Sequence, residues 1–152
     1  MKTEKKKSSA KKISPRLCSA CLLGVRCRFD GKRKPNRKVL ALAKKEIFIL
    51  VCPEQLGGFA IPHEPSEQRE GRVVSRSGKD VTAHFLRGAR EVLKIARLFS
   101  VQEVIFKQRS PSCGCGEIYD GSFTGAVVPG DGVTTALLKK NGITVITEEE
   151  LP

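Results

Sequence analysis

The order of apolar and polar residues along the chain predicts strands that alternate with helices. Short apolar runs typical of buried strands occupy residues 16–20, 47–51, 101–106 and 143–147. Apolar residues spaced three and four apart predict helices over residues 37–46, 80–100 and 133–140. Strands that alternate with helices are typical of a parallel sheet covered on both faces. We therefore predict a single α/β domain over residues 16–152, with a mostly parallel, three-layer, Rossmann-like sheet.

The segments between these elements are predicted to be loops. Residues 22–37 and 57–65 hold the glycines and prolines that favour turns over regular structure. Residues 67–79 are mostly polar, and Val73-Val74 within them can form a short edge strand. An excursion of this kind after the end of a strand often covers a binding site.

Three of the predicted strands run directly into a loop that contains cysteine. Cys21 follows the first strand, Cys52 the second and Cys113 the third, the last in a loop that begins with Ser110-Pro111. The carboxyl ends of parallel strands lie along one edge of an open α/β sheet, where ligands bind. The pattern therefore predicts that cysteines 31 and 61 residues apart converge on one site.

Positive charge is concentrated in the first third of the chain. The net charge of the 152 residues is +12; residues 1–15 carry six lysines against one glutamate, and residues 16–45 carry ten lysines and arginines against one aspartate. The first 15 residues have no apolar periodicity, which predicts a disordered basic tail. The basic residues that follow Cys21 favour an anionic or electron-rich substrate, or RNA.

The composition also bears on the compartment and on the use of the cysteines. No apolar run approaches the roughly 20 residues that cross a bilayer, and the lysine-rich start has no apolar signal core, so we expect a cytoplasmic protein without a membrane partner. In such a compartment, six cysteines are better explained as free thiols, metal ligands or catalytic thiols than as disulfides.

Two kinds of metal site are compatible with the cysteine spacing. The close pairs Cys18/Cys21 and Cys113/Cys115 can supply the four thiolates of a structural zinc site, although zinc ribbons usually use two pairs of the Cys-x-x-Cys type. One cysteine from each strand end can instead hold an iron-sulfur cluster at three corners and leave the fourth iron open. In that case Cys18, Cys27 and Cys115 are not cluster ligands. The spacing alone leaves both sites open.

Two polar residues beside these cysteines are candidates for catalysis. Glu54 lies two residues after the cysteine of the second strand, where a carboxylate can orient or deprotonate a water, and Ser110 can donate a hydrogen bond to a developing charge. A glutamate in an exposed loop and a serine that caps a turn are the alternatives. His63 and His84 have no partner that the sequence reveals. Gly130-Asp131-Gly132 can direct backbone N–H groups at an anion, or can simply begin the last helix.

The chain carries four ordered motifs. They are SACLLGVRCRFDG (residues 19–31), VCPEQLGGFAIP (51–62), KQRSPSCGCGEIYDGSFTG (107–125) and GDGVTTALLKKNGITVITEEEL (130–151). Together they resemble the thiouracil desulfurase family, which long carried only a domain-of-unknown-function label, over nearly everything after residue 16. Phe29 stands where that family often has tyrosine. His63-Glu64 stands where a basic residue and a proline are common, and this difference bears on the identity of the substrate.

The resemblance implies an α/β domain that binds a 4Fe-4S cluster through three cysteines, which map onto Cys21, Cys52 and Cys113, with one iron that has no protein ligand. It also implies two catalytic side chains, which map onto Glu54 and Ser110. The implied reaction is a hydrolytic desulfuration without net redox change, in which oxygen replaces the sulfur of a thiolated pyrimidine such as thiouracil or 4-thiouridine and sulfide is released. In it, Glu54 would activate the water, and Ser110 would relay a proton or stabilise charge.

Three further hypotheses stay open. Relatives of the family also act on thiouridine within tRNA, usually with an extra domain, and the basic first third of this chain is a candidate substitute; RNA affinity should then fall steeply with added salt. A zinc-stabilised nucleic-acid-binding module predicts zinc in a colourless protein. A sulfur-carrier protein predicts labile sulfur on a single thiol and no iron.

Overall fold

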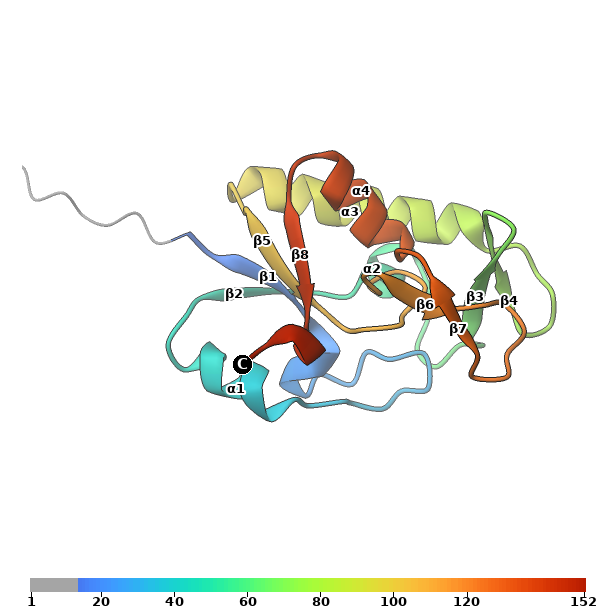
Figure 1. Cartoon of the computed structure of the whole chain (residues 1–152), viewed down its shortest axis with the longest axis horizontal. Coiled ribbons are helices and arrows are strands. Elements are labelled where there is room, and N and C mark those ends of the chain that lie inside the picture. The colour runs from blue at the N-terminus through green and yellow to red at the C-terminus, as the bar shows by residue number, and fades with distance from the viewer. Residues whose placement is uncertain (1–13) are drawn as a thin grey trace, which may run out of the picture.

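A four-stranded sheet lies at the centre of the computed structural model, which describes residues 14–152 (Figure 1). Its strands are β1 (Arg16–Ser19), β2 (Phe48–Val51), β5 (Glu103–Phe106) and β8 (Thr144–Thr147). They lie in the order β2-β1-β5-β8, and every neighbouring pair is parallel. Each strand falls on one of the apolar runs, so the predicted parallel sheet is confirmed. The predicted basic tail, except for Ser14 and Pro15, lies outside the described residues.

Helices cover both faces of this sheet, because successive strand residues point to opposite sides. Leu17 and Val104 lie in a buried cluster that includes side chains of two of the helices, α3 and α4, whereas their neighbours Cys18 and Ile105 lie in a second cluster with side chains of a third, α1. Figure 1 shows α3 and α4 on one side of the sheet and α1 on the other. The three-layer arrangement is therefore confirmed. The helices are α1 (Arg37–Ala43), α3 (Thr82–Leu98) and α4 (Val133–Lys140).

The strand order places a topological switch at the centre of the sheet. From β1 the chain moves to the outer strand β2 on one side, and from β5 it moves to β8 on the other side. Connections that leave two neighbouring strands in opposite directions open a crevice at the carboxyl ends of those strands. Because β1 and β5 pair directly, this crevice lies between the loop that carries Cys21 and the loop that carries Cys113.

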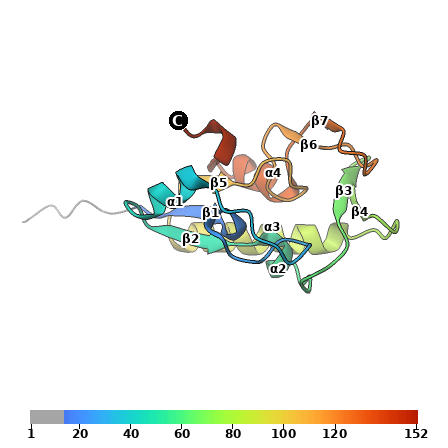
Figure 2. The same cartoon turned by 90° about the horizontal axis from the view of Figure 1, so that it is seen from below.

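The sequence pattern does not predict several short elements. Val73-Val74 lies in a strand, as predicted, but its antiparallel partner is polar and lacks alternation. The single helical turns are too short to show a period. Figure 2 shows two hairpins, β3–β4 and β6–β7, together at one end of the molecule. The short elements are η1 (Ala20–Leu23), α2 (Pro53–Leu56), β3 (Ser66–Arg69), β4 (Arg72–Ser75), β6 (Glu117–Tyr119), β7 (Val127–Pro129) and η2 (Glu148–Glu150), and of these the sequence predicts β4 alone.

Candidate active site

The carboxyl ends of all four parallel strands open into one cavity of about 740 Å³. Its wall contains Cys21 after β1, Cys52 after β2, and Cys113 in the loop after β5. Glu54 and Ser110 line the same cavity. The structure thus brings together the five residues that the sequence singled out, from three separate segments of the chain.

The two hairpins supply another part of the cavity wall. Glu67 of β3 is buried, and its Oε1 accepts two backbone N–H groups of the β6–β7 turn at 3.1 and 3.2 Å. Gln68 Nε2 donates to the carbonyl oxygen of Pro111 at 3.0 Å. Residues 65–67 and Arg76 line the cavity. The excursion after β2 therefore covers the site, as predicted, and polar bonds attach it to the loop of Cys113.

A fourth thiol lies beside two of the cysteines in the cavity. Cys27 is buried and lines the cavity, its thiol lies beside those of Cys21 and Cys52, and its carbonyl oxygen accepts from Cys52 Sγ at 3.4 Å. Donation from Cys27 lowers the pKa of Cys21, and it lowers the pKa of Cys52 to about 7 against the opposing effect of burial. Both thiols are thereby biased toward the thiolate, which is the form that binds metals.

The short helix α2 places Glu54 beside Cys52. Cys52 precedes the first turn, and Pro53 takes the first helical position, where the N–H that it lacks would have had no helical partner. The N–H of Leu56 donates to the carbonyl oxygen of Cys52 at 3.0 Å. The Cys-Pro-Glu sequence therefore holds the thiol and the carboxylate on a single turn.

A turn rich in hydroxyl groups presents Cys113. Ser110 Oγ accepts the N–H groups of Ser112 and Cys113, both at 3.2 Å, and lies 3.0 Å from Ser112 Oγ. Ser112 Oγ donates to Cys113 Sγ at 3.5 Å, so the Ser110 hydroxyl is the donor between the two serines. Burial raises the pKa of Cys113 against the hydrogen bonds from Ser112 and Ser19. Ser110 thus closes the turn, as one alternative held, and still lines the cavity.

The N-terminal end of α4 holds this turn in place. The backbone N–H groups of residues 132–134 donate to carbonyl oxygens of the turn at 2.7 to 2.9 Å. Thr135 Oγ1 donates to the carbonyl oxygen of Cys113 at 2.9 Å. The N–H of Gly130 donates to the carbonyl oxygen of Gly116 at 3.2 Å. Because the N–H groups of both Gly130 and Gly132 are used inside the protein, they are not free to bind an anion.

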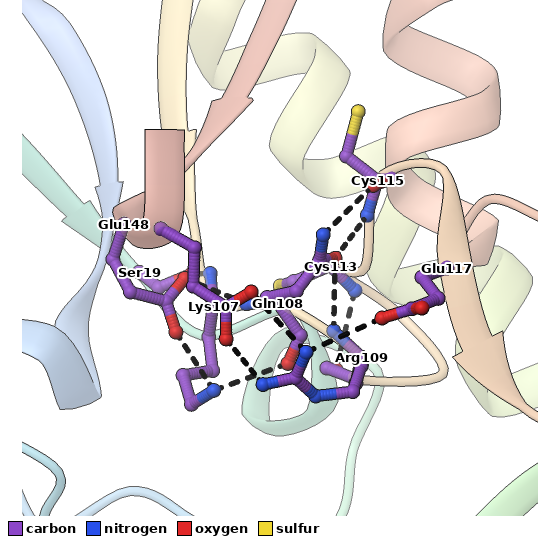
Figure 3. Close-up of polar contacts among 10 residues, drawn as sticks. Ser19, Lys107, Gln108, Arg109, Cys113, Cys115, Glu117 and Glu148 are labelled. Carbon is purple, nitrogen blue, oxygen red and sulfur yellow. Dashed lines mark hydrogen bonds and ion pairs between the residues drawn. The ribbon is translucent and has the colours of Figure 1, made fainter. Parts of the chain in front are cut away.

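A largely buried ion pair lies in the cavity wall (Figure 3). Lys107 Nζ, after β5, lies 2.7 Å from Glu148 Oε1, after β8, and the Glu148 side chain is 7% exposed. Glu148 Oε2 accepts the N–H of Gln108 at 2.8 Å, and the Lys107 N–H donates to Ser19 Oγ at 3.0 Å. These bonds join the carboxyl ends of β1, β5 and β8 and place an ammonium group beside the cavity.

Glu54 has a partner that the sequence did not reveal. His63 Nε2 lies 3.0 Å from Glu54 Oε2, and the two side chains are only 10% and 14% exposed. Burial lowers the pKa of His63, but the hydrogen bond and the negative charge of Glu54 outweigh this effect and raise it. The two residues are nine positions apart across a loop rich in glycine and proline, where no periodic pattern pairs them.

The two remaining cysteines point away from the cavity. Cys18 is buried in the cluster beneath α1, and burial raises its pKa to about 12. Cys115 Sγ lies 3.6 Å from the carbonyl oxygen of Val145, and Figure 3 shows it directed away from the pair formed by Lys107 and Glu148. Within residues 14–152, no three His, Cys, Asp or Glu side chains are grouped to hold a single metal ion. The four sulfurs of the alternative zinc site do not come together.

The thiols of the cavity wall fit an iron-sulfur cluster. Cluster iron takes thiolate ligands, and Cys21, Cys52 and Cys113 line one cavity. Cys113 is buried, and a thiol that coordinates a metal loses its proton even where burial opposes ionisation. The cavity of about 740 Å³ leaves room beside the three thiols for several iron and sulfide ions.

Comparison with known proteins identifies the family. The family model of 2-thiouracil desulfurase matches residues 17–150. The chain belongs to this family. It is 41% identical over 145 residues to the uncharacterized protein YbbK of Bacillus subtilis (strain 168), and the match covers 89% of this chain and 96% of YbbK. A solved structure of TudS, a 4Fe-4S-dependent thiouracil desulfidase, is also 41% identical, with a TM-score of 0.86 over 91% of this chain and 93% of that one.

Membership of the 2-thiouracil desulfurase family confirms the resemblance carried by the four motifs. The match to the family model, over residues 17–150, includes nearly all of the central sheet and the loops that contribute Cys21, Cys52 and Cys113. In the described part of this desulfurase-family chain, no helix combines the length and the apolar character that a membrane crossing requires.

Proposed function

We propose that this chain is an iron-sulfur-dependent thiouracil desulfurase. The observation that carries the proposal is the meeting of three thiols, one carboxylate and one hydroxyl group, from three strand ends, at a single cavity. The family of the chain and the 4Fe-4S dependence of the similar protein TudS support the same chemistry. The substrate is a thiolated pyrimidine, and the product is the corresponding oxo base.

Cys21, Cys52 and Cys113 would hold the cluster at three corners and leave one iron without a protein ligand. When bound, the cluster supplies a Lewis-acidic iron that makes the thiocarbonyl carbon more electrophilic. The lowered pKa values of Cys21 and Cys52 favour the thiolate forms that this role requires. The ammonium group of Lys107, although it is paired with Glu148, also contributes to the lowered pKa of Cys21.

Glu54 is the base that removes a proton from the attacking water. Its carboxylate lies on the same turn as Cys52 and lines the cavity, so a water at the substrate is within its reach. Ser110 stabilises the charge that develops on the pyrimidine ring. Its hydroxyl, which donates to Ser112 in the absence of substrate, can turn to donate to the ring.

The reaction balances as a hydrolysis. The carbon–sulfur double bond of the substrate breaks, and the carbon forms a double bond with the oxygen of water. The two protons of that water leave with the sulfur as hydrogen sulfide. Since no atom changes its oxidation state, the enzyme needs neither a reductant nor an oxidant.

Thiouridine and RNA stay predictions. Thiouridine rests on the family resemblance, and RNA on the basic first third of the chain, which includes basic residues in the loop after Cys21. Four of them, Arg26, Lys32, Arg33 and Lys34, are exposed. The family description and the TudS protein support a free thiouracil base as the substrate to test first.

Anaerobic purification, followed by turnover with 2-thiouracil and 4-thiouracil, tests the proposal. We expect about four irons and four acid-labile sulfides per chain, conversion of at least one thiouracil to uracil, and release of an equal amount of sulfide. A protein with a full iron content that leaves both bases unchanged would contradict the proposal. A protein that binds zinc and no iron would contradict it as well.

Alanine at position 132 is expected to displace the turn that carries Cys113. A Cβ atom on Gly132 would lie 2.4 Å from the carbonyl carbon and oxygen of Ser112, so the backbone must move. We expect a loss of about 1–3 kcal/mol of stability together with a reduced iron content, measured by denaturant unfolding and iron analysis. Gly142→Ala is the control, since it strains a position with φ of +77° in open space far from the cavity. Gly132→Ala with normal iron content would contradict this account of the turn.

A further inference from the structure

The imidazole of His63 faces a hydrogen-bond acceptor at each of its two nitrogens. Nδ1 lies 2.7 Å from the carbonyl oxygen of Glu64, and Nε2 lies 3.0 Å from Oε2 of Glu54. A carbonyl oxygen can only accept, so Nδ1 carries a hydrogen. A second hydrogen then lies between Nε2 and Oε2. The ring is therefore fixed at both ends, and one of those ends is the carboxylate of Glu54.

Packing restricts the same ring. Phe59 stacks on His63 with ring centroids 4.3 Å apart and ring planes 17° from parallel. The backbone N–H of His63 donates to the carbonyl oxygen of Phe29 at 2.8 Å, which joins this loop to the loop that carries Cys27. With 10% of its side chain exposed, His63 has little freedom to move away from Glu54.

The two oxygens of Glu54 have different surroundings. Oε2 is bound by His63, whereas no donor within residues 14–152 forms a hydrogen bond with Oε1. Glu54 lines the cavity, and His63 does not. A carboxylate that is held at one oxygen cannot rotate freely, so its second oxygen stays available to the cavity in a constant orientation.

We propose that His63 is a positioning residue for the desulfuration, which holds Oε2 of Glu54 so that Oε1 is ready to accept a proton from the attacking water. This inference rests on the proposed function, because it takes Glu54 as the base. His63 acts through Glu54 and does not touch the substrate. Misplacement of a catalytic group by about 1 Å costs on the order of 100-fold in rate, which sets the scale of the expected effect.

A neighbouring histidine provides a matched control. The ring of His84, in α3, has its centroid 4.7 Å from that of the same Phe59, but its Nδ1 lies 2.8 Å from the carbonyl oxygen of Gly57 and not beside a carboxylate. Replacing either histidine by phenylalanine removes one imidazole and its hydrogen bonding and keeps an aromatic ring against Phe59. The two variants therefore differ in whether Glu54 loses its partner.

The test compares His63→Phe, His63→Gln and His84→Phe in the iron-loaded enzyme with thiouracil as the substrate. His63→Phe is expected to lose about 10- to 100-fold in kcat, with KM within about twofold and unchanged iron content. His63→Gln places an amide nitrogen where Nε2 stood, so it is expected to recover kcat to within about fivefold of the wild type. His84→Phe is expected to keep kcat within about twofold of the wild type, even if the substitution lowers the melting temperature.

Several results would overturn the inference. One is an equal loss of kcat in His63→Phe and His84→Phe, and another is the failure of His63→Gln to recover activity, since both would assign His63 a structural role. The third is a crystal structure of His63→Phe in which the Glu54 carboxylate keeps its orientation. An active wild type with unaffected His63 variants removes this inference and leaves the proposed function intact. An iron-loaded wild type that releases no sulfide removes both.

Discussion

Cys21→Ala, Cys52→Ala and Cys113→Ala are each expected to give a folded protein that lacks the cluster and does not desulfurate thiouracil. Each thiol follows a different strand and lines the cavity, so the loss of one would remove a corner of the proposed cluster site. We expect iron to fall from about four per chain to below about one. Alanine fills most of the space of a thiol, which behaves as a small apolar group, so the fold is retained. Iron analysis and the absorption spectrum of each variant measure the effect.

Two cysteines outside the cavity are matched controls for these variants. The sulfurs of Cys18 and Cys115 contact backbone carbonyl oxygens, and neither residue lines the cavity. Cys18→Ala and Cys115→Ala are expected to keep the full iron content and to lose about 1 kcal/mol of stability from the small cavity created. Cys27→Ala is the most informative case, because Cys27 lines the cavity and lies outside the proposed ligand set. Iron lost in Cys27→Ala and kept in Cys52→Ala would contradict that set.

Glu54→Gln is expected to keep its cluster and to lose about 10²- to 10⁴-fold in kcat, because the amide cannot remove a proton from water. Ser110→Ala is expected to lose about 10²- to 10³-fold, because the donor to the charge on the ring is absent. Ser110→Ala also leaves two backbone N–H groups without their acceptor, which costs about 1 kcal/mol each. Rates of sulfide release, divided by the iron content of each preparation, measure the catalytic effect without the contribution of stability.

Glu54→Gln and Ser110→Ala each have a control variant, the first for the loss of a negative charge and the second for damage to the turn. Glu117 pairs with Arg109 at 3.2 Å beside the loop that carries Ser110, but Glu117 does not line the cavity. Glu117→Gln is therefore expected to keep wild-type activity. Ser110→Thr retains the hydroxyl and should restore most of the rate that Ser110→Ala loses. Full activity in Glu54→Gln would show that another group activates the water.

The positions of the three thiols at the edge of the sheet could be predicted because each follows an apolar run. The segments between those runs have helical spacing, which makes the strands parallel and brings their carboxyl ends to one edge. Cys21, Cys52 and Cys113 therefore converge in the structure as the strand pattern predicts. Glu54 and Ser110 reach the same cavity because each lies within three residues of one of these thiols.

Contacts between distant segments could not be predicted in the same way. Glu148 pairs with Lys107 because β8 lies beside β5. The pattern of apolar residues does not predict the order of strands in the sheet. His63 meets Glu54 across a loop without periodicity. The sequence allows an anion site at Gly130-Asp131-Gly132, and only the fold shows that the N–H groups of residues 132–134 donate to the turn of Cys113. The sequence does not predict the polar strand β3, because this strand has no apolar face that would give an alternating pattern. Its pairing with β4 and the buried side chain of Glu67 stabilise it instead.

The origin of the oxygen in the product tests the central claim most directly. The iron-loaded enzyme is incubated with thiouracil in water labelled with a heavy oxygen isotope, without an oxidant or a reductant, and the uracil is analysed by mass spectrometry. Hydrolysis at the cavity of Cys21, Cys52 and Cys113 predicts a labelled oxygen on the carbon that carried the sulfur, with sulfide released in an amount equal to the uracil. Unlabelled uracil, or uracil that forms only when an oxidant or a reductant is added, would contradict this account.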